Sequence, residues 1–214
     1  MGKDSETPGE SGVKQRLTAI FAADVVAYSR LMANDERATL AALDESRQLF
    51  KRAIESHGGH VVDMAGDSIL AAFDTASGAV YAALVAQSDI TNRNVDVTDD
   101  CKMLYRIGIH LGDILEKQDG SIYGDGVNIA ARLEGLAPPG GVTVSSEIQS
   151  TVASHCSASF HDQGEFEVKN IAHPVRVYLV SEGDSPEFLT LADGNSRLAA
   201  KGNIPVPATD LIGR

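Results

Sequence analysis

The chain has 214 residues and a formal net charge of −12, which is long enough for one sizeable domain whose core needs no disulfide bonds. The acidic excess argues against a general nucleic-acid binder, because phosphate contacts need clustered Lys and Arg. The two cysteines, Cys101 and Cys156, are isolated in sequence and indicate a reducing compartment. No run approaches the ~20 apolar residues of a membrane span, so we expect a cytoplasmic protein with no nucleic acid or membrane among its partners.

The first half of the chain follows the order β-α-β-β-α-β. Residues 1–14 are polar and are predicted to be disordered. Asn34 or Asp35 is the predicted N-cap of the first helix, which ends at Gly58-Gly59. The elements that follow from apolar spacing are a buried strand over 16–26, a helix over 34–59, a hairpin over 61–73 around the turn "MAGD", a helix over 75–94 and a long strand over 103–115.

The second half continues as α-β-α-β-β. The predicted elements are a helix over 124–137, a strand over 141–146, a helix over 146–155 capped by Ser145 or Ser146, and a closing hairpin over 160–180. Beyond residue 181 the apolar rhythm stops. We therefore expect an α+β fold over 15–181, with a ferredoxin-like βαββαβ core, added C-terminal α/β elements and helices packed on a mainly antiparallel sheet. Residues 182–214 are interpreted as a linker or tail.

Two aspartates stand at the ends of apolar strands. Asp24 ends the first predicted strand, and Asp67 lies in the turn of the predicted hairpin. Two carboxylates at adjoining strand ends repel each other unless a cation lies between them, and Mg²⁺ bridges carboxylates to phosphate oxygens. This favours a two-metal phosphoryl-transfer site. The alternative is that both are hydrogen-bonded turn residues, and their spacing alone does not exclude it.

A second polar pair lies in "GSIYGDGVNIAARLEGL". Asn128 and Arg132 are four residues apart and share one face of the predicted helix. A planar guanidinium can contact phosphate oxygens, and an amide can hold a hydroxyl. The alternative is a surface arginine paired with Glu134 or Asp125, and this segment alone leaves both interpretations open.

Together these segments resemble the class III nucleotidyl cyclase catalytic domain. The motifs that carry the resemblance are "FAADVVAYS", "AGDSILAAF", "YRIGIHLGD", "YGDGVNIAARLEGLAPPGG" and the closing "FEVKNIAHPVRVYLV". They occur in the family's order and extend over about residues 17–180. The resemblance implies an enzyme that converts ATP to cyclic AMP and pyrophosphate.

The resemblance also implies a role for individual residues. Asp24 and Asp67 match the aspartates that bind two Mg²⁺ or Mn²⁺ ions, with the backbone of Val25 as a further ligand. Asn128 matches the residue that positions the ribose, and Arg132 the one that stabilises charge on the α-phosphate. In the family the aspartates and the Asn/Arg pair come from different subunits, so a homodimer with shared sites is implied. The positions that match phosphate-binding groups are Ala27, Tyr28 and Lys169.

The base-reading positions depart from the family pattern. Asp63 stands where adenylyl cyclases commonly have lysine, and Ser121 occupies the second such position. An ionised carboxylate only accepts hydrogen bonds, which suits guanine at least as well as adenine. GTP therefore remains an alternative substrate, and a catalytically silent dimerisation or nucleotide-sensing module remains an alternative function. The final "NIPVPATDLIGR" is weakly similar to the lead-in to an ATPase-type regulatory domain, so such a domain in a longer protein is an expectation.

Overall fold

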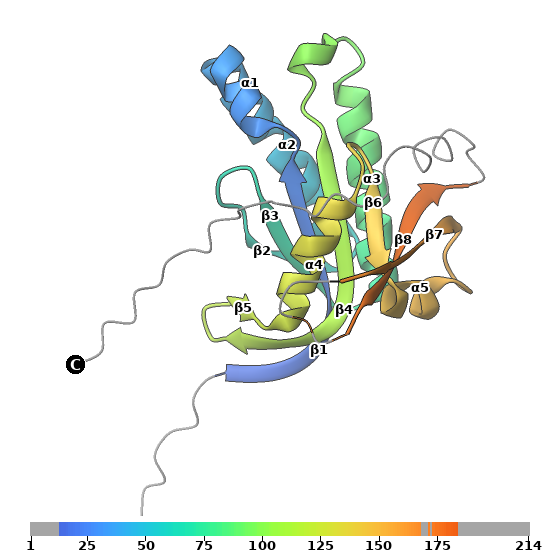
Figure 1. Cartoon of the computed structure of the whole chain (residues 1–214). Helices are drawn as coiled ribbons and strands as arrows, with labels where there is room; N and C mark the ends of the chain where they lie inside the picture. The colour runs from blue at the N-terminus through green and yellow to red at the C-terminus, as the bar shows by residue number, and fades with distance from the viewer. Residues whose placement is uncertain (1–12, 168–170, 172, 184–214) are drawn as a thin grey trace, which may run out of the picture. The chain divides into compact units, whose positions relative to one another are not determined.

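The computed structural model describes residues 13–167, 171 and 173–183, which form one mixed sheet with helices on both faces (Figure 1). The strands are β1 (Val13–Val25), β2 (Gly59–Asp63), β3 (Ile69–Phe73), β4 (Tyr105–Lys117), β5 (Ile122–Tyr123), β6 (Val142–Ser145), β7 (Ala158–Phe166) and β8 (Val175–Glu182). The helices are α1 (Tyr28–Asn34), α2 (Glu36–Ser56), α3 (Ala76–Arg93), the 3₁₀ turn η1 (Asp99–Cys101), α4 (Asp125–Leu136) and α5 (Ser146–Val152).

The strand order confirms the predicted ferredoxin-like core. The strands lie in the order β2-β3-β1-β4-β6-β8-β7, with β5 paired to β4. β1 is antiparallel to both β3 and β4, and β2 is antiparallel to β3. The pair β4–β6 is parallel, and the closing pair β7–β8 is antiparallel as expected. The first four strands thus have the order of a βαββαβ unit, and the later strands extend the sheet at the β4 edge.

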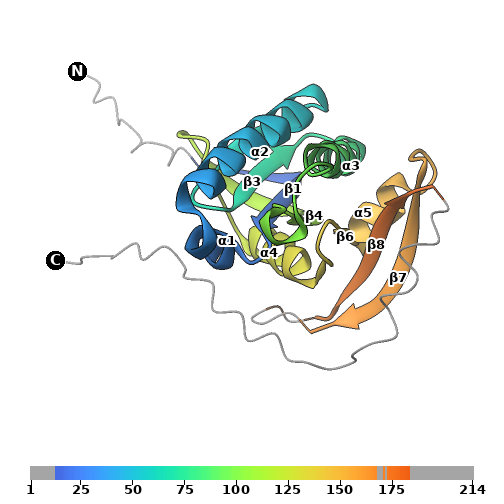
Figure 2. The same ribbon diagram turned by 90° about the horizontal axis from the view of Figure 1, so that it is seen from above.

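α2 and α3 cover one face of the sheet, and α4 lies on the other (Figure 2). On the first face Phe21 of β1 packs against Phe50 of α2, and the ring centroids of Phe50 and Tyr105 are 4.6 Å apart. On the second face Ile20 packs in a separate apolar cluster that includes Ala130 of α4. Successive residues of a strand therefore pack into two different apolar clusters, one on each face of the sheet, and α4 covers the second face.

Glycine at position 108 lets α4 approach β4 closely. A Cβ atom there would lie 2.1 Å from the amide nitrogen of Glu134 and 2.3 Å from the carbonyl oxygen of Ala130. Any side chain would push the helix away from the strand, so Gly108 fixes the distance of α4 from the sheet.

The helix starts follow the predicted caps in part. The Asp35 carboxylate accepts from Ala38 N at 2.9 Å and begins α2. Ser145 is the N-cap residue of α5, but its side chain does not cap the helix. The Ser145 hydroxyl instead lies 2.9 Å from Nδ1 of His110 on β4. The Ser145 hydroxyl, predicted to cap the helix, thus contacts a residue of a neighbouring strand instead.

Three features differ from the sequence prediction. β1 begins at Val13, so Val13 and Lys14 belong to the sheet and not to a disordered segment. Helix α1 and strand β5 are additional elements that apolar spacing did not separate from their neighbours. Lys169 and the tail from 184 onward lie outside the described residues. Within the described part, no helix has the length and apolar content to cross a membrane.

Candidate active site

Asp24 and Asp67 lie together at one end of β1 and the β2–β3 turn. β1 and β3 are antiparallel neighbours, with Ala23 opposite Ile69. Asp24 follows Ala23 and Asp67 precedes Ile69 by two residues, so both carboxylates lie at the same end of these two strands. The Ser68 hydroxyl donates to Oδ1 of Asp24 at 3.2 Å. The two carboxylates that the sequence placed at strand ends thus come from adjacent strands.

Burial and like-charge repulsion both disfavour the ionised form of Asp24. Burial raises the pKa of Asp24, and the negative charge of Asp67 raises it further. Hydrogen bonds from Ser68 and from the backbone of Val25 act in the opposite direction but do not cancel the effect. A cation between the carboxylates would remove the repulsion and favour the ionised form of Asp24.

The donor set fits a hard divalent cation. Among residues 13–167, 171 and 173–183 there is no group of three or more His, Cys, Asp or Glu side chains arranged to hold a metal. Two carboxylates leave most positions around a cation free for water and phosphate oxygens, which is the way proteins commonly bind Mg²⁺. Asp24 and Asp67 are therefore suited to a metal that arrives with a phosphorylated substrate.

The backbone turns sharply directly after Asp24. Ala27 has φ 54°, the one positive φ among the described residues other than glycine, and its carbonyl accepts from Arg30 N at 2.9 Å at the start of α1. Left-handed backbone is costly for alanine and is often found at functional sites. The backbone of Val25 donates to Asp24, and Ala27 and Tyr28 follow as the N-cap and the first residue of α1.

α4 carries the second predicted pair. Asn128 is exposed, and Arg132 is partly exposed one turn later on the same helix. The pKa of Asp24 is set by burial and by interactions with Asp67, Ser68 and Val25. Within the described part of the chain, Arg132 is not among the residues that shift it. Among the hydrogen bonds and ion pairs of the described residues, none joins Asn128 or Arg132 to Asp24 or Asp67.

The alternative role for Arg132 as the partner of Glu134 is not supported. Glu134 is 8% exposed and its pKa is raised to about 7, first by burial and then by the charge of Asp24. The positive charge that acts on Glu134 is Arg106 of β4, which lies opposite Asp24 in the β1–β4 register.

Arg106 and Glu134 are site residues that the sequence analysis did not assign to the site. The Nε of Arg106 is buried, and no residue of the described part accepts its hydrogen bond. Arg106 is the residue opposite Asp24 on the neighbouring strand. The register between β1 and β4 brings them together, and the alternation of the "YRIGIHLGD" strand was the only sequence signal for it.

The two predicted base-reading positions lie at the end of β2 and directly before β5. Asp63 is exposed at the end of β2, where a bulge shifts the register with β3. A carboxylate at this position could instead pair with Arg106 or a histidine, but no ion pair formed by the described residues includes Asp63. Ser121 precedes β5, and its amide donates to the Asp119 carboxylate at 2.9 Å.

The remaining titratable candidates have structural roles. His110 is 7% exposed, its ring contacts Ser145, and burial lowers its pKa, so it is a packed strand residue as expected. Cys101 and Cys156 are both free. These residues take no part in the carboxylate site.

Comparison with known proteins identifies the family of the chain. The model of the adenylate and guanylate cyclase catalytic domain family matches residues 11–182. A Rhizobium meliloti protein named "Putative adenylate cyclase 3" is 39% identical over 176 residues, which are 82% of this chain and 30% of that protein. An adenylate cyclase of Streptomyces coelicolor is 31% identical over 136 residues, 63% of this chain and 34% of that protein.

A solved structure supports the same relationship. The crystal structure of an adenylate/guanylate cyclase/hydrolase from Silicibacter pomeroyi has 42% sequence identity and a TM-score of 0.73, and the match covers 78% of this chain and 97% of that one. The present chain spans about a third of the length of the curated relatives it matches. From the matched family model, the sequence identity and the shared fold, the chain belongs to the adenylate and guanylate cyclase catalytic domain family, a family of lyases.

Proposed function

We propose that this domain converts ATP to 3′,5′-cyclic AMP and pyrophosphate, with two Mg²⁺ or Mn²⁺ ions held by Asp24 and Asp67. The observation that carries the proposal is the meeting of these two carboxylates at the ends of β1 and the β2–β3 turn, where the charge of Asp67 raises the pKa of Asp24. Such an arrangement is unfavourable by itself and becomes favourable with bound cations.

The residues of the chain have distinct roles in the reaction. The 3′-hydroxyl loses its proton, its oxygen forms a bond to the α-phosphorus, and the bond from that phosphorus to the oxygen shared with the β-phosphate breaks. Divalent ions, when bound, neutralise the triphosphate and lower the pKa of the 3′-hydroxyl. Asn128 orients the ribose, and Arg132 donates to the α-phosphate as charge develops there. Backbone amides after Val25 and the side chain of Lys169 are further donors to the phosphates.

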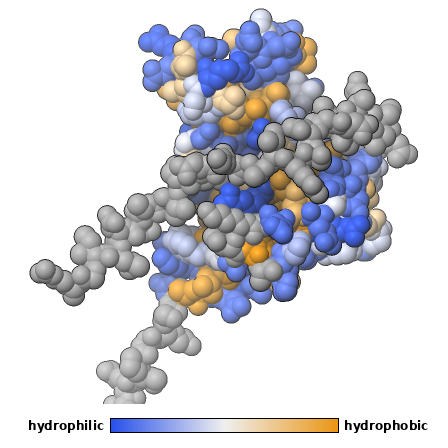
Figure 3. All heavy atoms as spheres, viewed as in Figure 1, coloured by the Kyte–Doolittle hydropathy of each residue, from blue (hydrophilic) through white to orange (hydrophobic). Residues whose placement is uncertain are grey.

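We further propose that the active form is a homodimer with two shared sites. The support is that no hydrogen bond or ion pair among the described residues joins Asn128 or Arg132 to Asp24 or Asp67, so their proposed partners are the carboxylates of a second copy. Apolar side chains on one sheet face also lack cover: Val13 is 42%, Leu17 63% and Leu115 45% exposed, and apolar surface lies at this lower left end of β1 (Figure 3). Contiguous exposed apolar surface is typical of an interface.

The preference for ATP rests on the relatives. The two curated proteins described above are named as adenylate cyclases. GTP is the second candidate, because the exposed carboxylate of Asp63 can accept from the N1–H and N2–H₂ groups of guanine. The proposal also includes a cytoplasmic location and control by a further domain in a longer protein. The catalytic domain expected over 15–181 extends to Val13 and Glu182, where β1 begins and β8 ends.

The test is an assay of the purified chain with Mn²⁺ and each nucleotide. Cyclic AMP formation that is lost in Asp67→Asn supports the proposal. If cyclic GMP is the main product, the substrate is GTP and not ATP. Binding of nucleotide without any product favours a catalytically silent sensing module. The Asp67→Asn variant keeps the shape of the side chain, so its far-UV spectrum serves as the control for folding.

A further inference from the structure

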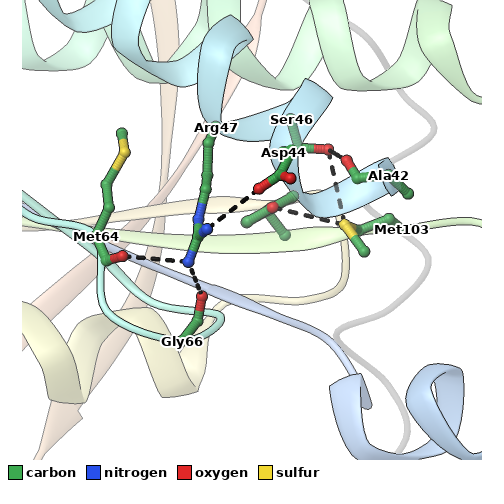
Figure 4. Close-up of polar contacts among 8 residues, drawn as sticks. Ala42, Asp44, Ser46, Arg47, Met64, Gly66 and Met103 are labelled. Carbon is green, nitrogen blue, oxygen red and sulfur yellow. Dashed lines mark hydrogen bonds and ion pairs between the residues drawn. The ribbon is translucent and has the colours of Figure 1, made fainter. Parts of the chain in front are cut away.

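An arginine on α2 holds the loop that carries Asp67. Nη2 of Arg47 donates to the carbonyl oxygens of Met64 at 3.2 Å and Gly66 at 2.6 Å (Figure 4). Nη1 of the same guanidinium donates to the Asp44 carboxylate at 3.3 Å. The side chain is 27% exposed, so these hydrogen bonds are partly shielded from water. One guanidinium thus connects α2 to two backbone carbonyls directly before Asp67.

Besides Arg47, the loop between β2 and β3 is held at its two ends, by Met64 packed against the core and by the Ser68 hydroxyl, which donates to Asp24. Its one backbone hydrogen bond outside the strands, among the described residues, runs from Ser68 N to the Ala65 carbonyl at 3.2 Å. Gly66 has φ 61° with open space around its Cα, so a flexible residue stands next to Asp67. The like charges of Asp67 and Asp24 repel each other, and this repulsion acts to push the loop outward. Hydrogen bonds from a charged donor are about twice as strong as neutral ones, so Arg47 is well suited to resist it.

We propose that Arg47 is a positioning residue that holds Asp67 opposite Asp24 before the metal ions arrive. The inference rests on the proposed function, since it assigns a role toward the cations that Asp24 and Asp67 would hold. Arg47 touches neither cation nor substrate and acts through the backbone of Met64 and Gly66. Asp44 fixes the plane of the guanidinium, so that both carbonyls are reached at once. A lysine ammonium is a point charge without this planar fork.

A purely structural role for Arg47 predicts a different result. α2 is already fixed by its buried residues, including Phe50 and Ile54, and by Arg93 of α3, whose Nη2 lies 2.9 Å from Oε2 of Glu45. Arg93 is therefore a matched control: it is an arginine that contacts the same helix, and it does not contact the loop. Losing either arginine lowers stability, but only Arg47 is expected to change the affinity for metal.

The experiment measures Mn²⁺ binding to the full chain in the presence of a non-cyclisable ATP analogue, by titration calorimetry. Because partners that orient metal ligands typically contribute 10–100-fold to metal affinity, Arg47→Met should weaken Mn²⁺ binding by about tenfold. Arg47→Lys should fall between Arg47→Met and the wild type. Arg93→Met should lower the melting temperature and leave Mn²⁺ affinity within about twofold of the wild type. At saturating Mn²⁺, kcat of Arg47→Met should recover, because the loop is then held by the ions.

The outcomes separate the two proposals. If the wild type binds Mn²⁺ and Arg47→Met binds it equally well, the role of Arg47 is refuted and the proposed function stands. If the wild type binds no Mn²⁺ with the analogue, both are refuted. Asp44→Asn covers the case in which Arg47→Met does not fold, because Asp44 is exposed and its loss frees the guanidinium. An Asp44→Asn chain with unchanged Mn²⁺ affinity and an unchanged amide exchange rate at Ser68 would then overturn the inference.

Discussion

The two halves of the candidate active site differ in how far a single chain completes them. Asp24 and Asp67 face each other, with Ser68 hydrogen-bonded to Asp24 at 3.2 Å and Arg47 holding the loop from behind. Asn128 and Arg132 share a face of α4. The two carboxylates meet within the chain and raise each other's electrostatic energy, whereas no hydrogen bond or ion pair of Asn128 or Arg132 to them occurs among the described residues. A shared site between two copies accounts for both facts.

Mixing two inactive variants is the most direct test of a site shared between two copies. Asp24→Ala removes the carboxylate half, and Arg132→Ala removes a donor to the α-phosphate, so each alone should lower kcat by about 10²–10³-fold or more. Mixed in equal amounts, they should recover about a quarter of wild-type activity, because half the dimers pair at random as heterodimers with one intact site of two. The measurement is the rate of cyclic AMP formation.

The control for this experiment mixes two variants of the same half. Asp24→Ala with Asp67→Ala leaves every site defective, so no recovery is expected. The shared site is ruled out if heterodimers of Asp24→Ala and Arg132→Ala form, as shown by tagged subunits, and remain inactive.

The spacing between the two halves depends on Gly108. A Cβ at this position would lie 2.1 Å from Glu134 N, so Gly108→Ala must displace α4 from β4. We expect a loss of about 3 kcal/mol in the free energy of unfolding, at the upper end for overpacked sites, together with reduced activity. Urea denaturation measures the first effect.

Gly135 provides the matched control on the same helix. A Cβ there meets nothing within 4 Å, so Gly135→Ala should raise the free energy of unfolding by about 0.5–1 kcal/mol through helix propensity. Equal stability of Gly108→Ala and the wild type would show that α4 is not fixed by its contact with β4.

The sequence was sufficient for those parts of the site that depend on local pattern. Apolar strands and a short turn located Asp24 and Asp67, and the spacing of four placed Asn128 and Arg132 on one helix face. The opposition of Asp24 and Arg106 depends on the register between β1 and β4, which strand patterns do not fix between distant segments. The same holds for Arg47, whose side chain crosses from α2 to the β2–β3 loop.

Short elements were missed for a related reason. Helix α1 has 7 residues and β5 has 2, and neither is long enough to show an apolar period. Ser145 shows the opposite failure, because its position was right for a helix cap while its hydroxyl contacts His110. Local propensity gave the element, and tertiary packing decided what the side chain does.

Glu134 is the α4 residue on which the charge of the carboxylate half acts. Its pKa is raised from 4.5 to about 7, by burial first and by Asp24 second. The folded state therefore binds this proton more tightly than the unfolded state. The resulting stabilisation is complete below pH 4.5 and is lost as the pH rises through about 7. Its full size is about 3 kcal/mol at most, from a shift worth about 1.4 kcal/mol per pKa unit.

Glu134→Gln tests this dependence. The variant should be more stable than the wild type at about pH 8 and should lose part of the decline in unfolding free energy between about pH 5 and pH 8. The measurement is urea denaturation in the presence of a chelator, so that bound metal does not offset the charges of Asp24 and Asp67. If the unfolding free energies of the two proteins change with pH in parallel, Glu134 does not cause the decline in stability between about pH 5 and pH 8.

The smallest expected effect concerns the base, at the edge of the carboxylate half. Asp63 is exposed at the end of β2, so water competes for any hydrogen bond it makes, and a carboxylate can accept from the two N–H groups of guanine but offers adenine no donor. Asp63→Asn should therefore lower kcat/KM for GTP by about tenfold, near the low end for loss of a paired hydrogen bond to a charged group, and should change kcat/KM for ATP by less than about threefold. Ser121→Ala is the companion variant, since a hydroxyl both donates and accepts and its loss should affect the two nucleotides alike. A larger loss for ATP than for GTP in Asp63→Asn would mean that the carboxylate accepts from the N6 amino group of adenine, and would assign ATP recognition to Asp63 itself.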